Sequence, residues 1–160
     1  MLSVRLICVG KLKEKFYREA CAEYEKRLKG YCKLEIVELN ERRLPDRPAQ
    51  AEIDAALRRE AEAIRAKIPN GAMVIAMCIE GKQQSSEQLA AILTDGMNRG
   101  VSQLCILIGG SCGLDEQLKR SASLRLSMSP MTFPHHLARV MVLEQVYRAL
   151  NIAAGGKYHK

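Results

Sequence analysis

Apolar residues in this chain of 160 residues gather in two alternating kinds of run. Runs of the first kind are short and nearly continuous, as in VRLICV, AMVIAMCI and LCILI. Such runs are typical of strands that are buried on both faces of a parallel sheet. Strands are therefore predicted at residues 2–9, 33–39, 72–79, 103–108 and 123–128.

Runs of the second kind repeat their apolar residues every three or four positions, which predicts amphipathic helices. One extends over residues 14–29, and a later one carries Ile53, Leu57, Ile64 and Ile68. A helix between the third and fourth strands has signals at both ends. Ser85 followed by Gln88 is a capping-box pattern, and Gly100 indicates where that helix stops.

The last expected helix, residues 136–153, is apolar around nearly its whole circumference. A helix of this kind is buried on more than one side. It is either a central core helix, or a helix with one side on its own sheet and the other against a second subunit of a symmetric dimer. The sequence leaves both interpretations open.

Strands and helices thus alternate five times along the chain. This order predicts one α/β domain over residues 1–160, with a mainly parallel sheet flanked by helices on both faces. The charged stretch ELNERRLPDRPAQ, residues 38–50, is the only long irregular segment, and we expect it to be mobile.

The chain is basic, with 25 Lys and Arg against 18 Asp and Glu and a net charge of +7. This favours a polyanionic partner such as RNA, although a modest positive charge also serves solubility alone. Basic residues cluster over residues 11–18, over residues 42–47 and in the tail. Aromatic residues make up 4% and Trp is absent, so a stacking platform for single strands is poorly supplied.

Six cysteines show no Cys-x-x-Cys pair, and we interpret them as buried, reduced thiols. The first ten residues predict a strand rather than a signal peptide, so a reducing cytoplasmic compartment without membrane association is expected. The three histidines, His135, His136 and His159, have no short-spaced set of Cys partners. No metal site is predicted.

The loop that follows the fourth strand, in LIGGSCGL, carries a glycine pair and a third glycine. In open parallel sheets, ligands bind beyond the carboxyl ends of strands, where this loop is expected to lie. The loop is not a dinucleotide fingerprint, and Gly81-Lys82 lacks the rest of a P-loop. A nicotinamide or flavin cofactor and nucleoside triphosphate hydrolysis are therefore disfavoured.

The segment LSMSPMTFPHHLARVMVLEQVYRAL has the richest chemistry. Pro130 and Pro134 restrict the backbone and predict a rigid loop. Beside a glycine-rich loop, such a loop can bind the edge of an adenine through backbone groups. Glu144 and Arg148 lie four residues apart on the expected helix and are predicted to pair with each other.

Three segments together carry a family resemblance: LCILIGGSCGL, SMSPMTFPHHLARVMVLEQVYRALNI and the terminal KYHK. They resemble the H family of ribosomal RNA large subunit methyltransferases, small members of the SPOUT (α/β-knot) S-adenosylmethionine-dependent methyltransferases. The resemblance extends over nearly the whole chain, and its C-terminal third is the specific part. Cys112 stands at a position that varies in the family, and the chain lacks a Trp that some members have.

The resemblance implies a homodimer in which the C-terminal stretch forms a trefoil knot that holds S-adenosylmethionine. It implies methylation of N3 of a pseudouridine in a stem-loop of 23S ribosomal RNA in the assembled ribosome. The implied cofactor contacts are Met77, Gly109, Gly110, Gly113, Met128, Ser129, Pro130, Met131, Thr132 and Phe133.

For this chemistry, N3 must lose its proton before it attacks the methyl group in line. Candidate bases are His135, His159 and Glu144. Arg139 and Arg148 are candidates to hold the imide anion or a phosphate, and Tyr158 is a candidate to stack on the flipped base or to position it. Residues 155–160 are expected to close over the pocket of their own or a partner subunit. The sequence does not rank these residues.

Two functions of other classes stay open. The chain could be a non-enzymatic ribosome-binding factor, for which salt-sensitive RNA binding without a cofactor is expected. It could also be an unknotted α/β enzyme that binds a nucleotide as a monomer.

Overall fold

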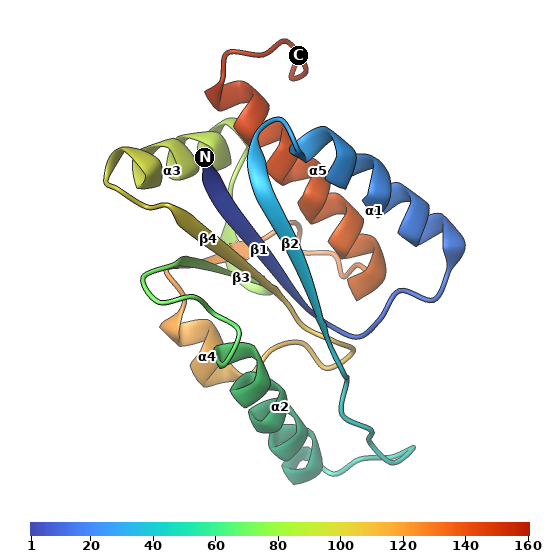
Figure 1. Cartoon of the computed structure of the whole chain (residues 1–160). Helices are drawn as coiled ribbons and strands as arrows, with labels where there is room; N and C mark the ends of the chain where they lie inside the picture. Colours follow the sequence, from blue (N-terminus) through green and yellow to red (C-terminus); the bar gives the residue numbers. More distant parts are fainter.

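A computed structural model describes all residues, 1–160, and its centre is one sheet of five parallel strands (Figure 1). The strand order is β2-β1-β4-β3-β5. The strands are β1 (Leu2–Val9), β2 (Cys32–Leu39), β3 (Met73–Gln83), β4 (Gln103–Ile108) and β5 (Leu124–Ser127). All five predicted strands and their parallel arrangement are confirmed.

The third strand is longer than predicted, because it continues through the polar residues that end at Gln83. Its pairing with β5 is interrupted between Met77 and Lys82. Within this interruption, a Cβ on Gly81 would lie 2.8 Å from the backbone of Arg125, so only glycine fits there without movement. The last residues of β3 are polar and include a bulge, so they carry no apolar run. For this reason the strand predicted from apolar residues stops at residue 79 instead of Gln83.

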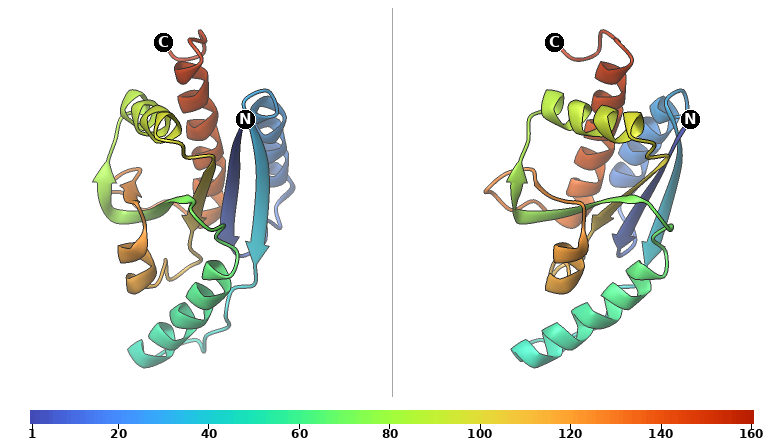
Figure 2. Two further views of the ribbon diagram at one scale, coloured as in Figure 1. Left: turned by 60° about the vertical axis from the view of Figure 1, so that its left-hand side comes forward. Right: turned by 90° about the vertical axis from the view of Figure 1, so that its left-hand side faces the viewer.

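Helices cover both faces of the sheet, as predicted (Figures 1 and 2). One face carries α1 (Lys15–Leu28), α3 (Ser86–Asn98) and α5 (His135–Ala153), and the other carries α2 (Gln50–Arg65) and α4 (Glu116–Ser121). Side chains alternate between the faces along β1, so Leu6 belongs to the core under α1, α3 and α5 while Ile7 belongs to the core under α2 and α4.

Local signals explain where α3 begins and ends. The Ser85 hydroxyl accepts the Gln88 backbone N–H at 3.1 Å, and the Gln88 side chain accepts the Ser85 N–H at 2.8 Å. This is the predicted capping box. The helix ends before Gly100, whose φ of 92° lies in the left-handed region that favours glycine. The short helix α4, which was not predicted, has an N-cap in Asp115 but too few residues to show an apolar repeat.

Helix α5 lies between α1 and α3 and packs on the sheet, which explains its apolar circumference (Figure 1). Its fully buried residues include Val142, Leu143 and Val146, whereas Val140 and Met141 are half-buried. The interpretation as a core helix is thus confirmed, and a second subunit stays a prediction. No helix of the chain combines the length and the apolar character that a membrane crossing requires.

Burial in α2 predicts a difference between two isoleucines of that helix. Ile64 is 1% exposed and Ile53 is half-buried, so Ile64→Ala leaves a cavity in the core and Ile53→Ala does not. The free energy of unfolding should fall by about 2–5 kcal/mol for Ile64→Ala and by clearly less for Ile53→Ala. Urea titration followed by circular dichroism measures both changes. Equal losses of unfolding free energy in the two variants would contradict the burial of Ile64 in the core under α2 and α4.

Candidate functional site

A cavity of about 540 Å³ lies beyond the carboxyl end of β4, between the segments that end β3 and follow β5. The three segments that line it come from residues 77–80, 108–114 and 126–135, with additional contacts from Lys119 and Ala138. Nine of the ten residues predicted to contact a cofactor line this cavity, and Pro130 does not. The structure therefore brings together residues that lie up to 56 positions apart, from Met77 to Phe133.

The glycines of the loop after β4 are required by the turn itself. A Cβ on Gly109 would lie 2.3 Å from the carbonyl oxygen of Gly113, and Gly113 has a φ of 79°. The Gly113 N–H donates to the Gly110 carbonyl at 3.1 Å and closes the turn. Steric exclusion thus explains this loop without a ligand, and its inner side lines the cavity.

The loop after β5 is ordered by its own hydroxyl groups. The Ser127 hydroxyl donates to the Ser129 carbonyl at 3.1 Å, and the Ser129 hydroxyl accepts the Met131 N–H at 2.9 Å. Pro130 fixes the backbone φ within this bend, and Pro134 fixes it just before α5. These contacts agree with the predicted rigid loop, and they leave the Met131 side chain 72% exposed.

Few charged groups line the cavity. Lys119 forms ion pairs with Glu80 and, at 3.1 Å, with Glu116. Burial disfavours the ammonium ion, but the hydrogen bonds to both carboxylates outweigh burial and raise the pKa of Lys119. Its positive charge is thus neutralised at the cavity wall.

His135 is the one predicted catalytic residue that lines the cavity. Burial lowers the pKa of its imidazole, His136 and Arg139 lower it further, and Glu41 opposes the shift. Because the pKa lies below the ordinary value of 6.5, the imidazole is neutral at pH 7 and can accept a proton.

Arg139 does not line the cavity. Its side chain is 3% exposed, and it donates to Glu38 Oε2 at 2.6 Å and to the Gly10 carbonyl at 3.0 Å. Burial of Glu38 favours its neutral form, but the bonds from Arg139 and from the Leu12 N–H outweigh burial and lower its pKa. This ion pair anchors the start of α5 to the ends of β1 and β2.

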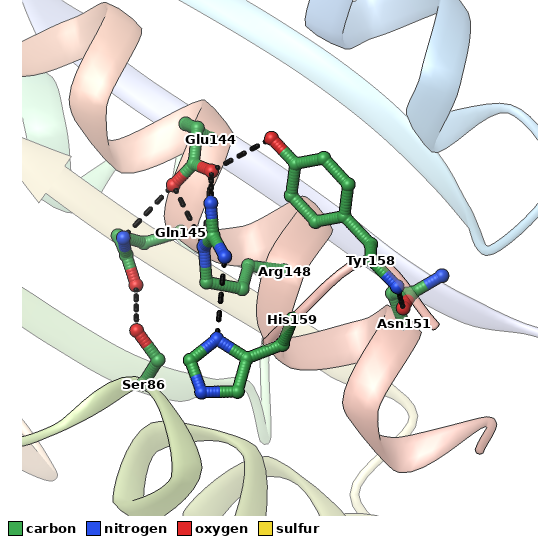
Figure 3. A network of polar contacts seen from close by, with 7 residues as sticks. All are labelled: Ser86, Glu144, Gln145, Arg148, Asn151, Tyr158 and His159. Carbon is green, nitrogen blue, oxygen red and sulfur yellow. Dashed lines mark hydrogen bonds and ion pairs between the residues drawn. The ribbon is translucent and has the colours of Figure 1, made fainter. Parts of the chain in front are cut away.

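The other four predicted catalytic residues form a polar cluster with one another (Figure 3). Arg148 Nε donates to Glu144 Oε1 at 3.0 Å, which confirms the predicted pairing along the helix. The Tyr158 hydroxyl donates to the same oxygen at 3.0 Å, and Arg148 Nη1 lies 3.2 Å from His159 Nδ1. The cluster consists of Glu144, Arg148, Tyr158 and His159, with Ser86 and Gln145 attached to it.

Asn151 holds the tail in this cluster, a role that the sequence analysis missed. Its carbonyl accepts the Gly156 N–H at 2.8 Å, and its side-chain oxygen accepts the Tyr158 N–H at 3.1 Å. The Asn151 amide in turn donates to the Tyr31 hydroxyl at 2.8 Å. At the far side, His159 Nε2 lies 2.7 Å from Glu87 Oε1. The last residues are thus docked on α5 and α3 rather than frayed.

Within one chain, the cluster and the cavity are separate. Ala138 lines the cavity, and Arg148 lies ten residues further along α5, which corresponds to about 15 Å of helix. A second, mainly apolar cavity of about 310 Å³ lies between them. It shares Met77, Leu126 and Met128 with the first cavity and reaches Ser86 and Gln145, which are attached to the cluster.

Two further expectations concern cysteines and metals. Cys8, Cys21, Cys32 and Cys105 are buried, but Cys78 is only half-buried, and the interpretation of all six as buried is wrong for Cys112, which is exposed. Cys112 lies on the tight glycine loop, where no core surrounds it. The chain has no group of three or more His, Cys, Asp and Glu side chains that could hold a metal ion.

Comparison with known proteins identifies the class to which this fold and cavity belong. A family model described as a predicted SPOUT methyltransferase matches residues 2–159. The chain belongs to the SPOUT methyltransferase family.

Within the family, the chain is similar to proteins named ribosomal RNA large subunit methyltransferase H. The one from Bifidobacterium adolescentis is 48% identical over 159 residues, which cover 99% of this chain and 100% of the relative. Those from Clostridium novyi and Streptococcus equi subsp. zooepidemicus are 45% and 43% identical, with the same coverage.

Two solved structures share the fold at low sequence identity. A probable methyltransferase from Bordetella pertussis has a TM-score of 0.59 at 16% identity, and the match covers 93% of this chain and 96% of that one. A probable methylase family protein from Haemophilus influenzae has a TM-score of 0.55 at 15% identity, covering 100% of this chain and 72% of that one. These likenesses support the fold alone.

The burial of the thiols predicts their order of alkylation. Burial raises the pKa of Cys8 to about 12 and of Cys32 and Cys105 to about 11, whereas Cys112 is exposed. Because the thiolate is the reactive form, iodoacetamide at pH 8 should label Cys112 first and leave Cys8 unlabelled in the native protein. Peptide mass spectrometry measures the labelling, and the urea-unfolded protein is the control. Early labelling of Cys8 in the native protein would contradict this packing.

Proposed function

We propose that this protein is an S-adenosylmethionine-dependent methyltransferase that modifies 23S ribosomal RNA. The proposed reaction is methylation of N3 of a pseudouridine in a stem-loop of the assembled ribosome, in the cytoplasm. One observation carries the proposal: the cavity gathers nine of the ten residues expected to contact the cofactor. The names of the relatives and the net charge of +7 agree with an RNA substrate.

The residues of the cavity fit S-adenosylmethionine. A volume of about 540 Å³ lies within the range of small-molecule sites. Its lining offers the turn of the glycine loop and the bend at Ser129, both of which bring backbone close to a ligand, together with the apolar side chains Met77, Leu126 and Met128. An adenine ring needs such apolar walls and backbone partners at its edge. When bound, the cofactor supplies a methyl group on a sulfonium.

The chain's own residues then have the task of orienting the acceptor and removing one proton. His135 is neutral at pH 7 and lies at the cavity, so it is suited to take that proton. Glu144 accepts hydrogen bonds from Arg148 and from the Tyr158 hydroxyl, so its carboxyl group is already engaged within the cluster. Arg148, with His159 beside it, supplies positive charge for an imide anion or a phosphate.

A second subunit would join the two halves of the proposed site. Because about 15 Å of helix separates Arg148 from the cavity of its own chain, a symmetric homodimer that places one tail against the partner's cavity would bring them together. The proposal includes this homodimer and the trefoil knot of the family. Phe16 on α1 is 62% exposed and places apolar surface on the face of the sheet that also carries α5.

Cofactor binding tests the proposal through one glycine. Gly109→Ala forces the loop apart because the new Cβ would lie 2.3 Å from the Gly113 oxygen, so the affinity for S-adenosylmethionine should fall by about tenfold or more. Gly30→Ala is the matched control, since no atom lies within 4 Å of its added Cβ. Calorimetry measures the affinity, and the mass in solution gives the oligomeric state.

Three results of this experiment discriminate between the functions. Binding by a dimer supports the proposal. A wild-type protein that binds ribosomal RNA in a salt-sensitive way but no S-adenosylmethionine is a ribosome-binding factor instead. A stable monomer that binds the cofactor and is fully active contradicts the homodimer with its composite site.

Deletion of residues 157–160 tests the role of the tail. The deletion removes Tyr158 and His159 from the cluster while it leaves the cavity lining unchanged. Methyl transfer to ribosomes should fall by about 100-fold or more, as is typical of a lost acid–base group, with calorimetric cofactor affinity unchanged. Intact ribosome methylation at the wild-type rate would exclude the tail from the mechanism.

A further inference from the structure

Glu41 lies in the irregular segment between β2 and α2 and reaches across to the glycine loop. Its Oε1 accepts both the backbone N–H of Ser111, at 2.7 Å, and the Ser111 hydroxyl, at 2.5 Å. The residues are 70 positions apart in the chain. Glu41 itself does not line the cavity, whereas Ser111 does. The carboxylate thus holds the loop without being part of the cavity lining.

The same carboxylate leaves no space for a side chain at Gly110, the second glycine of the pair. A Cβ on Gly110 would lie 2.6 Å from Glu41 Oε1, so any side chain there would displace the carboxylate. Gly109 is fixed by the turn, and Gly110 is fixed by Glu41. The close approach of the two segments is therefore built into both of them.

The segment that carries Glu41 is anchored on its other side. The backbone N–H of Arg42 donates to Glu60 Oε2 at 2.9 Å, and Glu60 on α2 is 7% exposed. Before it, the Leu39 carbonyl accepts the Gly10 N–H at 2.7 Å. Glu41 is thus held between β2 and α2, so its carboxylate has a defined position from which to hold Ser111.

The charge of Glu41 strengthens these contacts. Burial favours the neutral acid, but the two bonds from Ser111 and the nearby histidines His135 and His136 outweigh burial and lower the pKa of Glu41. The side chain is therefore ionised at neutral pH. Hydrogen bonds to an ionised acceptor are about twice as strong as neutral ones.

We propose that Glu41 is a positioning residue, which fixes the curvature of the loop 109–113 by holding Ser111 and so keeps the cavity in its binding shape. The inference rests on the proposed function, because it concerns the affinity of the cavity for S-adenosylmethionine. Without the carboxylate, the Ser111 N–H loses its acceptor and the loop gains alternative conformations. Part of the binding free energy is then spent on ordering the loop.

The full-length variants Glu41→Ala and Glu41→Gln test this role by calorimetry with S-adenosylmethionine. Glu41→Ala should weaken binding by about 10-fold to 100-fold, as expected for the loss of charge-assisted bonds. Glu41→Gln keeps a side-chain oxygen that can accept one of the two bonds, so it should restore most of the affinity. Glu19→Ala, on an exposed part of α1, is the matched control and should bind like the wild type.

Kinetics separate positioning of the cofactor loop from a general loss of structure. In ribosome methylation, Glu41→Ala should raise KM for S-adenosylmethionine far more than it lowers kcat at saturating cofactor, where the loss of the carboxylate near His135 has only a small effect. Ser111→Ala, which keeps the N–H and removes the hydroxyl, should show a smaller rise in KM. A fall in kcat equal to the loss of affinity would overturn the assignment as a positioning residue.

The inference and the proposed function fail in different ways. A wild-type protein that does not bind S-adenosylmethionine overturns the proposed function. If the wild-type protein binds S-adenosylmethionine, and Glu41→Ala and Glu41→Gln bind it with the wild-type affinity, only the proposed role of Glu41 is overturned. Should Glu41→Ala not fold, a Ser111→Ala variant with the affinity and the KM of the wild type has the same meaning.

Discussion

The parallel pairing of all five strands is the constraint on which the other features depend. Since every strand runs in the same direction, the loops after β2, β3, β4 and β5 all emerge at the same end of the sheet, where the carboxyl ends of the strands lie. The cavity forms between the second half of β3 and the loops after β4 and β5, and the loop after β2 supplies Glu41 from outside the lining. An antiparallel β4 or β5 would move the loop that follows it, and with it one wall of the cavity, to the opposite end of the sheet.

Much of this architecture is visible in the sequence because it depends on repeated local patterns. Continuous apolar runs indicate β1 and β4, and the capping box at Ser85 marks the start of α3. The position of the cavity follows from the direction of the strands and the glycine pair. Its lining residues, however, were expected from the family resemblance, since backbone-mediated contacts carry no distinctive side-chain pattern.

Two features of the site that sequence analysis missed each depend on a single side chain that contacts a residue far away in the sequence. Glu41 and Ser111 are 70 positions apart, and Glu41 lies in a segment without any periodicity. Asn151 is a polar residue in an apolar helix, and nothing in the pattern connects it to Tyr31. The sequence analysis grouped the expected catalytic residues by their chemistry. The structure places His135 at the cavity, near the start of α5, and puts the cluster of Glu144, Arg148, Tyr158 and His159 further along this helix.

The ion pair between Arg139 and Glu38 joins positions that are 101 residues apart. It fixes the start of α5 beside the cavity, and a buried charge of this kind is costly unless its partner is in place. The last wall of the cavity therefore exists only in the fully folded chain. A molecule that occupies the cavity binds only the fully folded chain. Its concentration therefore shifts the equilibrium toward the folded state by mass action.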